Sequence, residues 1–437
     1  ADFGMHEDES AYPSPRRAWW AVAVLTLANV SAFVDRQILS LLVVPIRRDL
    51  GIGDEEMSYL MGLSFALFYT VLGIPLGRLA DRRSRRAIVG WGIAVWSVMT
   101  TLSGLARGYG QLLLARVGVG VGEAALGPAA ISLIADAFPR DRRGTAMGVY
   151  SIGTFLGSGL AYFVGGAVVG AVSAEATWHW PVVGALRPWQ SVFLLIGPPG
   201  LLVALLFLTV AEPARRERLD SRASPALWAW VRANRRLFWS QSVGFALSAT
   251  VNYGIAAWLA TFLMRTHGWP VARAGMVQGT LTMTVGVLGV VAGGRLSDWF
   301  VRRGRTDGPL LVGMIGALGM LVSATAYPLV PSVTLVVALL VPVNLFAALP
   351  WGAASAAAAE VMPASLRAQG SALYFFLLSL ISGVLGPTAV AVVTQRVFGG
   401  DAQLRYGLAV VSAVGMSLTL LLLAYARGPY RARVTSG

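Results

Sequence analysis

The stretch Gly77-Arg78-Leu79-Ala80-Asp81, which runs on to Arg85-Arg86, decides the fold because it occurs twice in the chain. Its second copy is Gly294-Arg295-Leu296-Ser297-Asp298, which runs on to Arg302-Arg303. Glycine, aspartate and the arginine pair keep the same relative positions, and 294 − 77 gives an offset of 217 residues, about half of the 437-residue chain. Each copy lies between two long apolar segments. The repeat therefore predicts two similar membrane-embedded halves, an arrangement found in many secondary transporters.

The composition is typical of a membrane protein. Of the residues, 56% are hydrophobic and 13% are charged, and a water-soluble domain with this balance would have too little polar surface to cover itself. The chain has no cysteine and no lysine, which excludes disulfides, thiolate metal sites, Schiff bases and P-loop chemistry. The formal net charge is +14, but the arginines occur in short clusters between apolar segments. This placement favours positive-inside loops over nucleic-acid binding.

The chain contains twelve apolar segments long enough to cross a bilayer, which takes about 20 residues. We therefore expect an all-α membrane protein with twelve transmembrane helices in two six-helix halves. The expected spans are 18–44, 57–77, 87–106, 110–137, 145–172, 189–210, 237–264, 272–297, 308–328, 332–361, 368–395 and 403–426.

These spans divide the chain into a tail at 1–17, an N-terminal half at 18–211, a linker at 212–236, a C-terminal half at 237–427 and a tail at 428–437. The first span follows Arg16-Arg17 without a small-residue cleavage site, so we expect a retained helix and not a signal peptide. Within the linker, Leu227, Trp228, Trp230 and Val231 predict an amphipathic helix at the membrane interface. The arginine clusters fall on alternate loops, which predicts that both termini are cytoplasmic.

Residues 77–86 read Gly-x-Leu-Ala-Asp-Arg-x-x-Arg-Arg and resemble the signature loop of the major facilitator superfamily, with Ser84 where that family often has glycine. The resemblance implies that the loop latches the two halves together when the cytoplasmic side is closed; the alternative is a plain topology signal without a gating role. We expect Gly77 to allow close helix approach and Asp81 to accept from arginines or to cap the third helix. The gating candidates are Gly77, Asp81, Arg82, Arg85, Arg86, Gly294, Asp298, Arg302 and Arg303.

Two further patterns resemble the Spinster group within that superfamily, and the chain is similar to its bacterial members. They are Phe33-Val34-Asp35-Arg36 in the first span and Arg116 with Gly118, Gly120, Gly122 and Glu123 in the fourth. The resemblance implies export of lysophospholipids or sphingosine-1-phosphate-like lipids. Bacterial relatives that carry sugar acids or other organic anions share parts of the same pattern.

Four ionisable residues lie inside predicted spans, where a buried charge costs at least about 2.5 kcal/mol. The helical rise places Asp35 and Arg116 at similar depth and Glu123 nearer the midplane, on the same helix face as Arg116. We expect Asp35 and Arg116 to pair in one state, Asp35 and Glu123 to serve proton coupling, and Arg36 and Arg116 to bind an anionic headgroup. The alternative is a static ion-pair network that holds the N-terminal half together.

Polar and aromatic residues on other helices predict the rest of the substrate site, although each could instead make packing or lipid contacts. These candidates are Asn29, Phe33, Asn252, Tyr253, Trp258, Asn344, Trp351, Tyr374 and Phe375. A charged N-terminal wall that faces an apolar C-terminal wall would suit an amphiphile with a phosphate and a tail.

The sequence therefore predicts a monomeric secondary transporter, integral to the inner (plasma) membrane, that moves amphipathic lipid-like anions by alternating access and is coupled to protons. It contains no Walker-type loop, and its three histidines lie outside the spans, so we expect no ATP use, metal, cofactor or enzyme activity. We expect membrane lipids as partners and no nucleic acid. The alternatives are a proton-coupled carrier of small organic anions or drugs and, in another class, a non-transporting receptor or scaffold.

Overall fold

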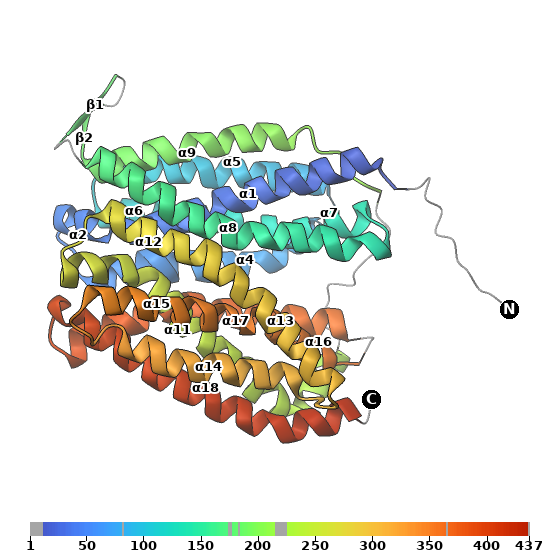
Figure 1. The fold of residues 1–437 in the computed structure, drawn as a ribbon. Helices are drawn as coiled ribbons and strands as arrows, with labels where there is room; N and C mark the ends of the chain where they lie inside the picture. The colour runs from blue at the N-terminus through green and yellow to red at the C-terminus, as the bar shows by residue number, and fades with distance from the viewer. Residues whose placement is uncertain are drawn as a thin grey trace. The chain divides into compact units, whose positions relative to one another are not determined.

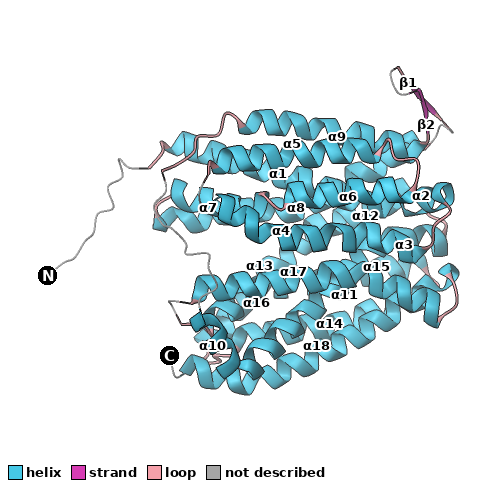
Figure 2. Cartoon of the chain, turned by 180° about the vertical axis from the view of Figure 1, so that it is seen from behind, coloured by secondary structure: helices cyan, strands magenta, loops and turns pink. Residues whose placement is uncertain are grey.

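A computed structural model describes residues 12–80, 83–173, 177–181, 184–214, 225–363 and 366–435 (Figures 1 and 2). Within these residues the chain is almost entirely helical, with one short hairpin as its only sheet. The structure divides into two compact units. The first takes the described residues of Ala1–Pro45 and Leu67–Asp220, and the second takes those of Ile46–Ala66 and Ser221–Gly437. The predicted boundaries at 18–211 and 237–427 remain predictions, and the segment 46–66 lies in the second unit.

The first unit is built from helices that follow one another along the chain, with a hairpin between the last two. Its elements are α1 (Pro15–Leu41), the start of α2 (Val43–Leu50), most of α4 (Ser64–Ala80), α5 (Arg85–Ser103), α6 (Tyr109–Glu123), α7 (Leu126–Ala137), α8 (Arg140–Val172), β1 (Trp178–Trp180), β2 (Gly184–Leu186) and α9 (Pro188–Phe207). The two strands are antiparallel, with Trp178 opposite Leu186.

The second unit also consists of helices, three of which contain or continue into a π-helical turn. Its elements are α3 (Asp54–Ser58), η2 (Tyr59–Leu63), α10 (Pro225–Ala233), α11 (Arg235–His267), α12 (Val271–Leu281), η3 (Thr282–Gly286), α13 (Val287–Arg302), α14 (Gly308–Ala326), α15 (Val333–Ala348), α16 (Pro350–Glu360), α17 (Arg367–Val392), η4 (Val393–Val397), η5 (Asp401–Gln403) and α18 (Leu404–Thr435).

Local sequence signals explain several helix ends. Pro15 and Pro188 occupy the first turns of α1 and α9. A backbone N–H in the first turn has no intrahelical acceptor, so a proline, which lacks this N–H, costs the helix no hydrogen bond there. The Ser84 hydroxyl accepts from the Ala87 backbone N–H and caps α5. Gly268 ends α11 with a φ of 65°, a left-handed conformation that glycine adopts without steric penalty.

Among the described residues, ten helices are long and apolar enough to cross a membrane. They correspond to ten of the predicted spans, and the protein is therefore an integral, multi-pass membrane protein. The other two predicted spans, 57–77 and 87–106, are helical as well, in η2 with α4 and in α5, but they are not among these ten. Twelve crossings remain a prediction.

Each unit has its own apolar core. In the first unit, Trp96 of α5 is fully buried among small and branched side chains of α1 and α7. In the second unit, the helix α10 forms where the linker predicted one, and it buries Leu227, Trp230 and Val231 against α11, α16 and α18. The apolar face of this predicted interfacial helix is thus covered by protein, while Trp228 stays exposed.

Ion pairs hold the segment 46–66 to the rest of the second unit. The Asp54 side chain is fully buried and accepts two hydrogen bonds from Arg265 of α11, at 2.7 and 2.8 Å. Arg47 pairs with Asp54 at 3.0 Å and also with Asp401. Such paired geometry is what a buried carboxylate requires. Burial nevertheless raises the pKa of Asp54, against the opposing effect of Arg265.

Candidate functional site

Four charged side chains gather in the first unit, two from α1 and two from α6. Asp35, Arg116 and Glu123 are almost completely buried, at 2%, 1% and 1% exposure. The Arg36 side chain keeps 21% of its surface exposed. Two acids and two bases give the cluster no formal net charge, which lowers the penalty for holding ions away from water.

Arg36 and Glu123 form the central ion pair of this cluster. The Nε and Nη2 atoms of Arg36 both lie 2.6 Å from Oε2 of Glu123. The guanidinium also lies over two aromatic rings, with its central carbon 5.2 Å from the centre of Phe33 and 5.0 Å from that of Tyr69 in α4. Arg36 is therefore fixed by a charge-assisted hydrogen bond and by two cation–π contacts.

The predicted pairing of Asp35 with Arg116 is not the one this structure makes. Both are in electrostatic range of Glu123 and of each other, but no described hydrogen bond joins them. Within the described part of the chain, Nε and Nη1 of Arg116 and Oε1 of Glu123 have no hydrogen-bond partner. The site thus holds one satisfied ion pair beside a buried cation and a carboxylate oxygen with bonding capacity to spare.

Close packing against α5 explains two of the glycines of α6. A Cβ on Gly118 would lie 2.5 Å from Met99 Cγ, and one on Gly122 would lie 2.7 Å from the backbone of Gly92 and of Trp96. Gly118 and Gly122 therefore allow α6 to approach α5 closely, on the side of α6 that faces away from Arg116 and Glu123.

The sequence did not single out several polar and aromatic side chains of the first unit that the structure shows to be buried or paired. Tyr69 stacks on Arg36, and the buried Trp96 leaves its Nε1 without a described hydrogen-bond partner. The Tyr162 hydroxyl donates to Oε1 of Gln37 at 2.6 Å. A polar or aromatic side chain inside an apolar span is the signal that could have identified them. The predicted Asn29 is buried and donates to the Thr154 hydroxyl at 3.1 Å.

The predicted candidates of the second unit divide by exposure. Trp258 and Tyr374 have no exposed surface, and Trp258 Nε1 donates to the Pro387 carbonyl at 2.9 Å. Both side chains pack inside the protein in this conformation, and their assignment to substrate contact stays a prediction. Asn344 donates to the Leu340 carbonyl of its own helix at 2.9 Å. The half-buried or exposed candidates are Asn252, Asn344, Tyr253, Trp351 and Phe375.

In the first copy of the repeated motif, Arg85 is buried. It has 1% exposure, and it pairs with Asp136 of α7 and donates to the Ser132 hydroxyl at 2.8 Å and the Pro213 carbonyl at 2.9 Å. Its backbone N–H also donates to Glu212 at 2.8 Å. Burial opposes ionisation of Glu212, but hydrogen bonds from Ser84 and Arg85 outweigh it and lower the pKa of Glu212.

The other predicted gating residues of this copy are exposed, make ordinary contacts or lie outside the described residues. Arg86 is exposed, and its Nη1 donates to the Leu208 and Val210 carbonyls at 3.4 and 3.5 Å. Asp81 and Arg82 lie outside the described residues. A Cβ on Gly77 would meet Pro128 Cβ at 3.6 Å, an ordinary contact distance, so this glycine is not required for close helix approach.

In the second copy, Asp298, Arg302 and Arg303 are all exposed, and Arg303 stacks on Trp299 at 4.1 Å. A Cβ on Gly294 would meet nothing within 4 Å. The close approach occurs one residue earlier, where a Cβ on Gly293 would lie 1.9 Å from the Leu349 carbonyl oxygen.

Comparisons with known proteins identify the family. The family model described as Major Facilitator Superfamily matches residues 25–387. An MFS-type efflux pump of Mycolicibacterium smegmatis is 30% identical over 418 residues, which cover 93% of this chain and 92% of that protein. Protein spinster homolog 1 of Homo sapiens is 33% identical over 332 residues, which cover 71% of this chain and 60% of that protein.

A solved structure of similar fold also relates the chain to the Spinster proteins. It is the crystal structure of a bacterial homolog to the human lysosomal transporter Spinster, in an inward-facing and unoccupied conformation. It matches with a TM-score of 0.81 and 29% identity, over 97% of this chain and 99% of that one. The chain therefore belongs to the major facilitator superfamily of membrane transporters and, within it, is similar to the Spinster proteins.

Proposed function

We propose that this membrane transporter moves amphipathic lipid-like anions, of the lysophospholipid or sphingosine-1-phosphate type, by proton-coupled alternating access. The observation that carries the proposal is the ion pair between Arg36 and Glu123, beside Arg116, two of whose guanidinium nitrogens have no hydrogen-bond partner among the described residues. An arginine is well suited to a phosphate because its planar N–H groups match phosphate oxygens. The relationship to Spinster proteins supports the lipid class.

In this proposal, proton coupling arises because the Glu123 carboxylate and the anionic substrate compete for Arg36. While Glu123 is ionised, its Oε2 occupies both Nε and Nη2 of that guanidinium at 2.6 Å. A proton on Glu123 weakens the ion pair and leaves the cluster with a net positive charge, which favours an incoming anion. By linkage, a bound anion then favours the proton to the same extent. Asp35, buried beside the pair, is proposed as a second proton site.

The experiment measures uptake of a radiolabelled lysophospholipid into proteoliposomes, with and without an imposed pH gradient. Wild-type uptake should respond to the gradient, and Glu123→Gln should transport at a rate that no longer depends on it. The matched control is Glu360→Gln in α16, where the same chemical change lies outside the charged cluster and the Tyr430 hydroxyl can still donate to the amide. Gradient dependence that survives in Glu123→Gln would remove Glu123 as the proton site.

Arg36 is tested separately from the proton. Arg36→Gln keeps a hydrogen-bond donor but removes the charge that recognises the phosphate, so we expect lysophospholipid binding to weaken about tenfold or more, in line with the loss of a charge-assisted bond. Equilibrium binding in detergent, measured at two pH values, is the readout. Unchanged affinity in a folded Arg36→Gln protein would contradict the role given to this residue.

A carrier of small organic anions or drugs is the second candidate, and the similarity over 93% of this chain to a protein named an efflux pump favours it. Both candidates use the same charged cluster. Competition distinguishes them, since a lysolipid should inhibit uptake of a small organic anion only if the site accepts lipids.

The topology is part of the proposal. The alternating arginine clusters support cytoplasmic termini in the plasma membrane, with the two motif loops acting as a cytoplasmic gate. A reporter that is active only outside the cytoplasm, fused after α18, should be inactive. An active reporter would reverse the orientation without touching the transport proposal.

A further inference from the structure

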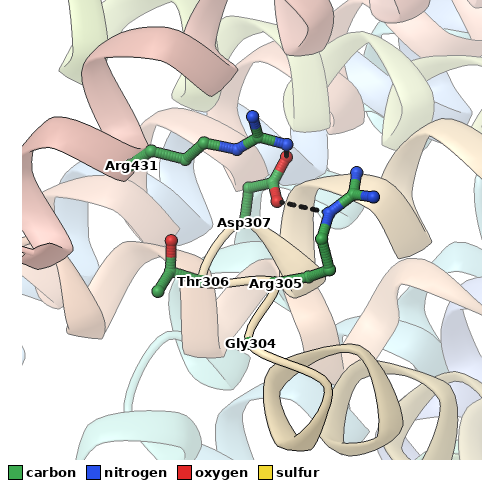
Figure 3. Close-up of a pocket in the computed structure, with 5 residues that line it drawn as sticks. All are labelled: Gly304, Arg305, Thr306, Asp307 and Arg431. Carbon is green, nitrogen blue, oxygen red and sulfur yellow. Dashed lines mark hydrogen bonds and ion pairs between the residues drawn. The ribbon is translucent and has the colours of Figure 1, made fainter.

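The loop between α13 and α14 forms a pocket with the end of α18 (Figure 3). The cavity measures about 510 Å³ and is lined by Gly304, Arg305, Thr306, Asp307 and Arg431. Gly304 has a φ of 79°, a left-handed conformation that turns the chain sharply at the rim of the pocket. Neither this pocket nor its residues belong to the charged cluster of the first unit.

Asp307 organises the arginines around the pocket. Its side chain is fully buried and accepts from Nε of Arg427 at 2.7 Å, from Nη2 of Arg431 at 2.7 Å and from Nε of Arg305 at 3.5 Å. In Figure 3, Arg431 and Arg305 approach the carboxylate from opposite sides. The aspartate thus pre-orders guanidiniums that would otherwise repel one another.

Among the described residues, the side chains that line the pocket or bind Asp307 carry an excess of positive charge. Three guanidiniums meet one carboxylate, and the side chains of Arg305, Arg427 and Arg431 remain 47%, 29% and 45% exposed. A carboxylate offers about four acceptor sites, whereas each guanidinium carries five N–H donors. Fixed, half-exposed guanidiniums of this kind suit the oxygens of a phosphate group.

The position of the pocket along the membrane-spanning helices indicates where the phosphate would come from. Candidate spans end at Arg302 and begin at Gly308, so the loop 303–307 lies at the boundary between membrane and water. The exposed Trp299, stacked on Arg303 at 4.1 Å, marks the same level, because tryptophan is enriched at membrane interfaces. Basic pockets between helix ends at this level bind phospholipid headgroups.

We propose that this pocket binds the phosphate of an anionic phospholipid headgroup from the surrounding membrane. The site would hold a resident lipid of the bilayer, apart from any transported molecule, and the inference does not depend on the proposed substrate. Arg305 and Arg431 contact the phosphate, Arg427 and Asp307 fix their geometry, and the Thr306 hydroxyl lines the pocket as an additional donor.

Native mass spectrometry of the full-length protein, freed of lipid in detergent, tests the site. Phosphatidylglycerol is titrated against phosphatidylcholine, which lacks the net negative charge. Arg305→Gln and Arg431→Gln should each weaken phosphatidylglycerol binding about fivefold, the effect of one arginine near a lipid phosphate. Arg302→Gln is the matched control, because Arg302 is exposed nearby but does not line the cavity.

Three outcomes would overturn the proposal. They are equal losses in Arg302→Gln and the two pocket variants, no loss in either pocket variant, and displacement of the lipid by inorganic phosphate at comparable concentration. The last of these would identify a site for free phosphate and not for a lipid. Arg305→Gln keeps the two shorter bonds to Asp307, so this variant should fold even if Arg431→Gln does not.

Discussion

The two loops that carry the repeated motif share its spacing, but their described residues bury opposite charges. In the first copy, the buried ion is the cation of Arg85, which is surrounded by Asp136, Glu212, the Ser132 hydroxyl and the Pro213 carbonyl. In the second loop, the buried ion is the anion of Asp307, which lies four residues beyond Arg303 and is surrounded by arginines. In each loop, one buried ion is surrounded by groups of the opposite charge, in inverse arrangements.

The difference teaches that a conserved spacing within one chain fixes where a loop lies, not which of its charges is buried. Arg302 stands at the position equivalent to Arg85, since 302 − 85 gives the repeat offset of 217, yet it is exposed. The charge of the neighbouring partners determines which ion is buried. Asp136 and Glu212 lie near the first loop, whereas Arg427 and Arg431 of α18 lie near the second.

The largest effect expected from this comparison is at Arg85. Arg85→Met should lower the free energy of unfolding by about 3–5 kcal/mol, because it leaves buried acidic partners without their cation. Chemical unfolding in detergent micelles measures the change. Arg86→Met is the control at the neighbouring, exposed position and should change stability by less than about 1 kcal/mol.

A second variant keeps this test informative if Arg85→Met does not fold. Arg85→Met combined with Asp136→Leu removes the cation and its more buried acidic partner and leaves only the partly exposed Glu212, and replacing a buried ion pair by apolar side chains is often neutral. The double variant should therefore be more stable than Arg85→Met alone. If it is less stable, the cation is not held mainly by charge pairing.

The next largest effect is expected at Asp307. Asp307→Asn keeps the size of the side chain but leaves three guanidiniums without their shared anion, which should destabilise the protein by about 1–3 kcal/mol. The loss is smaller than at Arg85 because the half-exposed arginines can be hydrated. Asp298→Asn, at an exposed position of the motif that precedes Asp307, is the control and should have little effect. Equal losses at both aspartates would break the comparison.

Much of the fold could be predicted from the sequence. The offset repeat and the apolar segments are properties of the chain alone, and ten of the predicted spans are helices long enough to cross a membrane. The placement of the segment 46–66 in the second unit could not be predicted, because it depends on Asp54 meeting Arg265, a residue 211 positions away. Hydropathy does not encode such pairings.

The candidate site was predicted less completely. The cost of burying charge identified all four members of the cluster, and helical geometry placed Asp35 and Arg116 at similar depth and Arg116 and Glu123 on one helix face. It did not identify Arg36 as the partner of Glu123, since depth along a helix says nothing about rotation toward a neighbour. The same limit applies to Trp258 and Tyr374, which are fully buried. The sequence alone does not tell whether an aromatic side chain in a span faces a cavity or the core.

A pH effect follows from the buried anion of the second loop, Asp307. Burial opposes ionisation of Asp307, but hydrogen bonds from Arg431 and Arg427 outweigh it and lower its pKa. The stability it contributes is therefore complete above its unfolded pKa of about 3.9 and is lost as the pH falls through the lower native value. Wild type should lose more stability than Asp307→Asn between pH 5 and pH 3, by no more than the full effect of that substitution. Parallel loss in both proteins would assign the acid sensitivity to other carboxylates.

The smallest effect is expected at Arg302, and it makes the most direct comparison of the two copies. Arg302→Met is the same substitution at the same motif position as Arg85→Met, but an exposed arginine that leaves no buried acid behind should change the free energy of unfolding by less than about 0.5 kcal/mol. Chemical unfolding of both variants under one set of conditions gives the difference directly. If Arg302→Met were as damaging as Arg85→Met, position in the motif and not burial would determine the role of the arginine, and the inversion of charge between the two copies would have no energetic meaning.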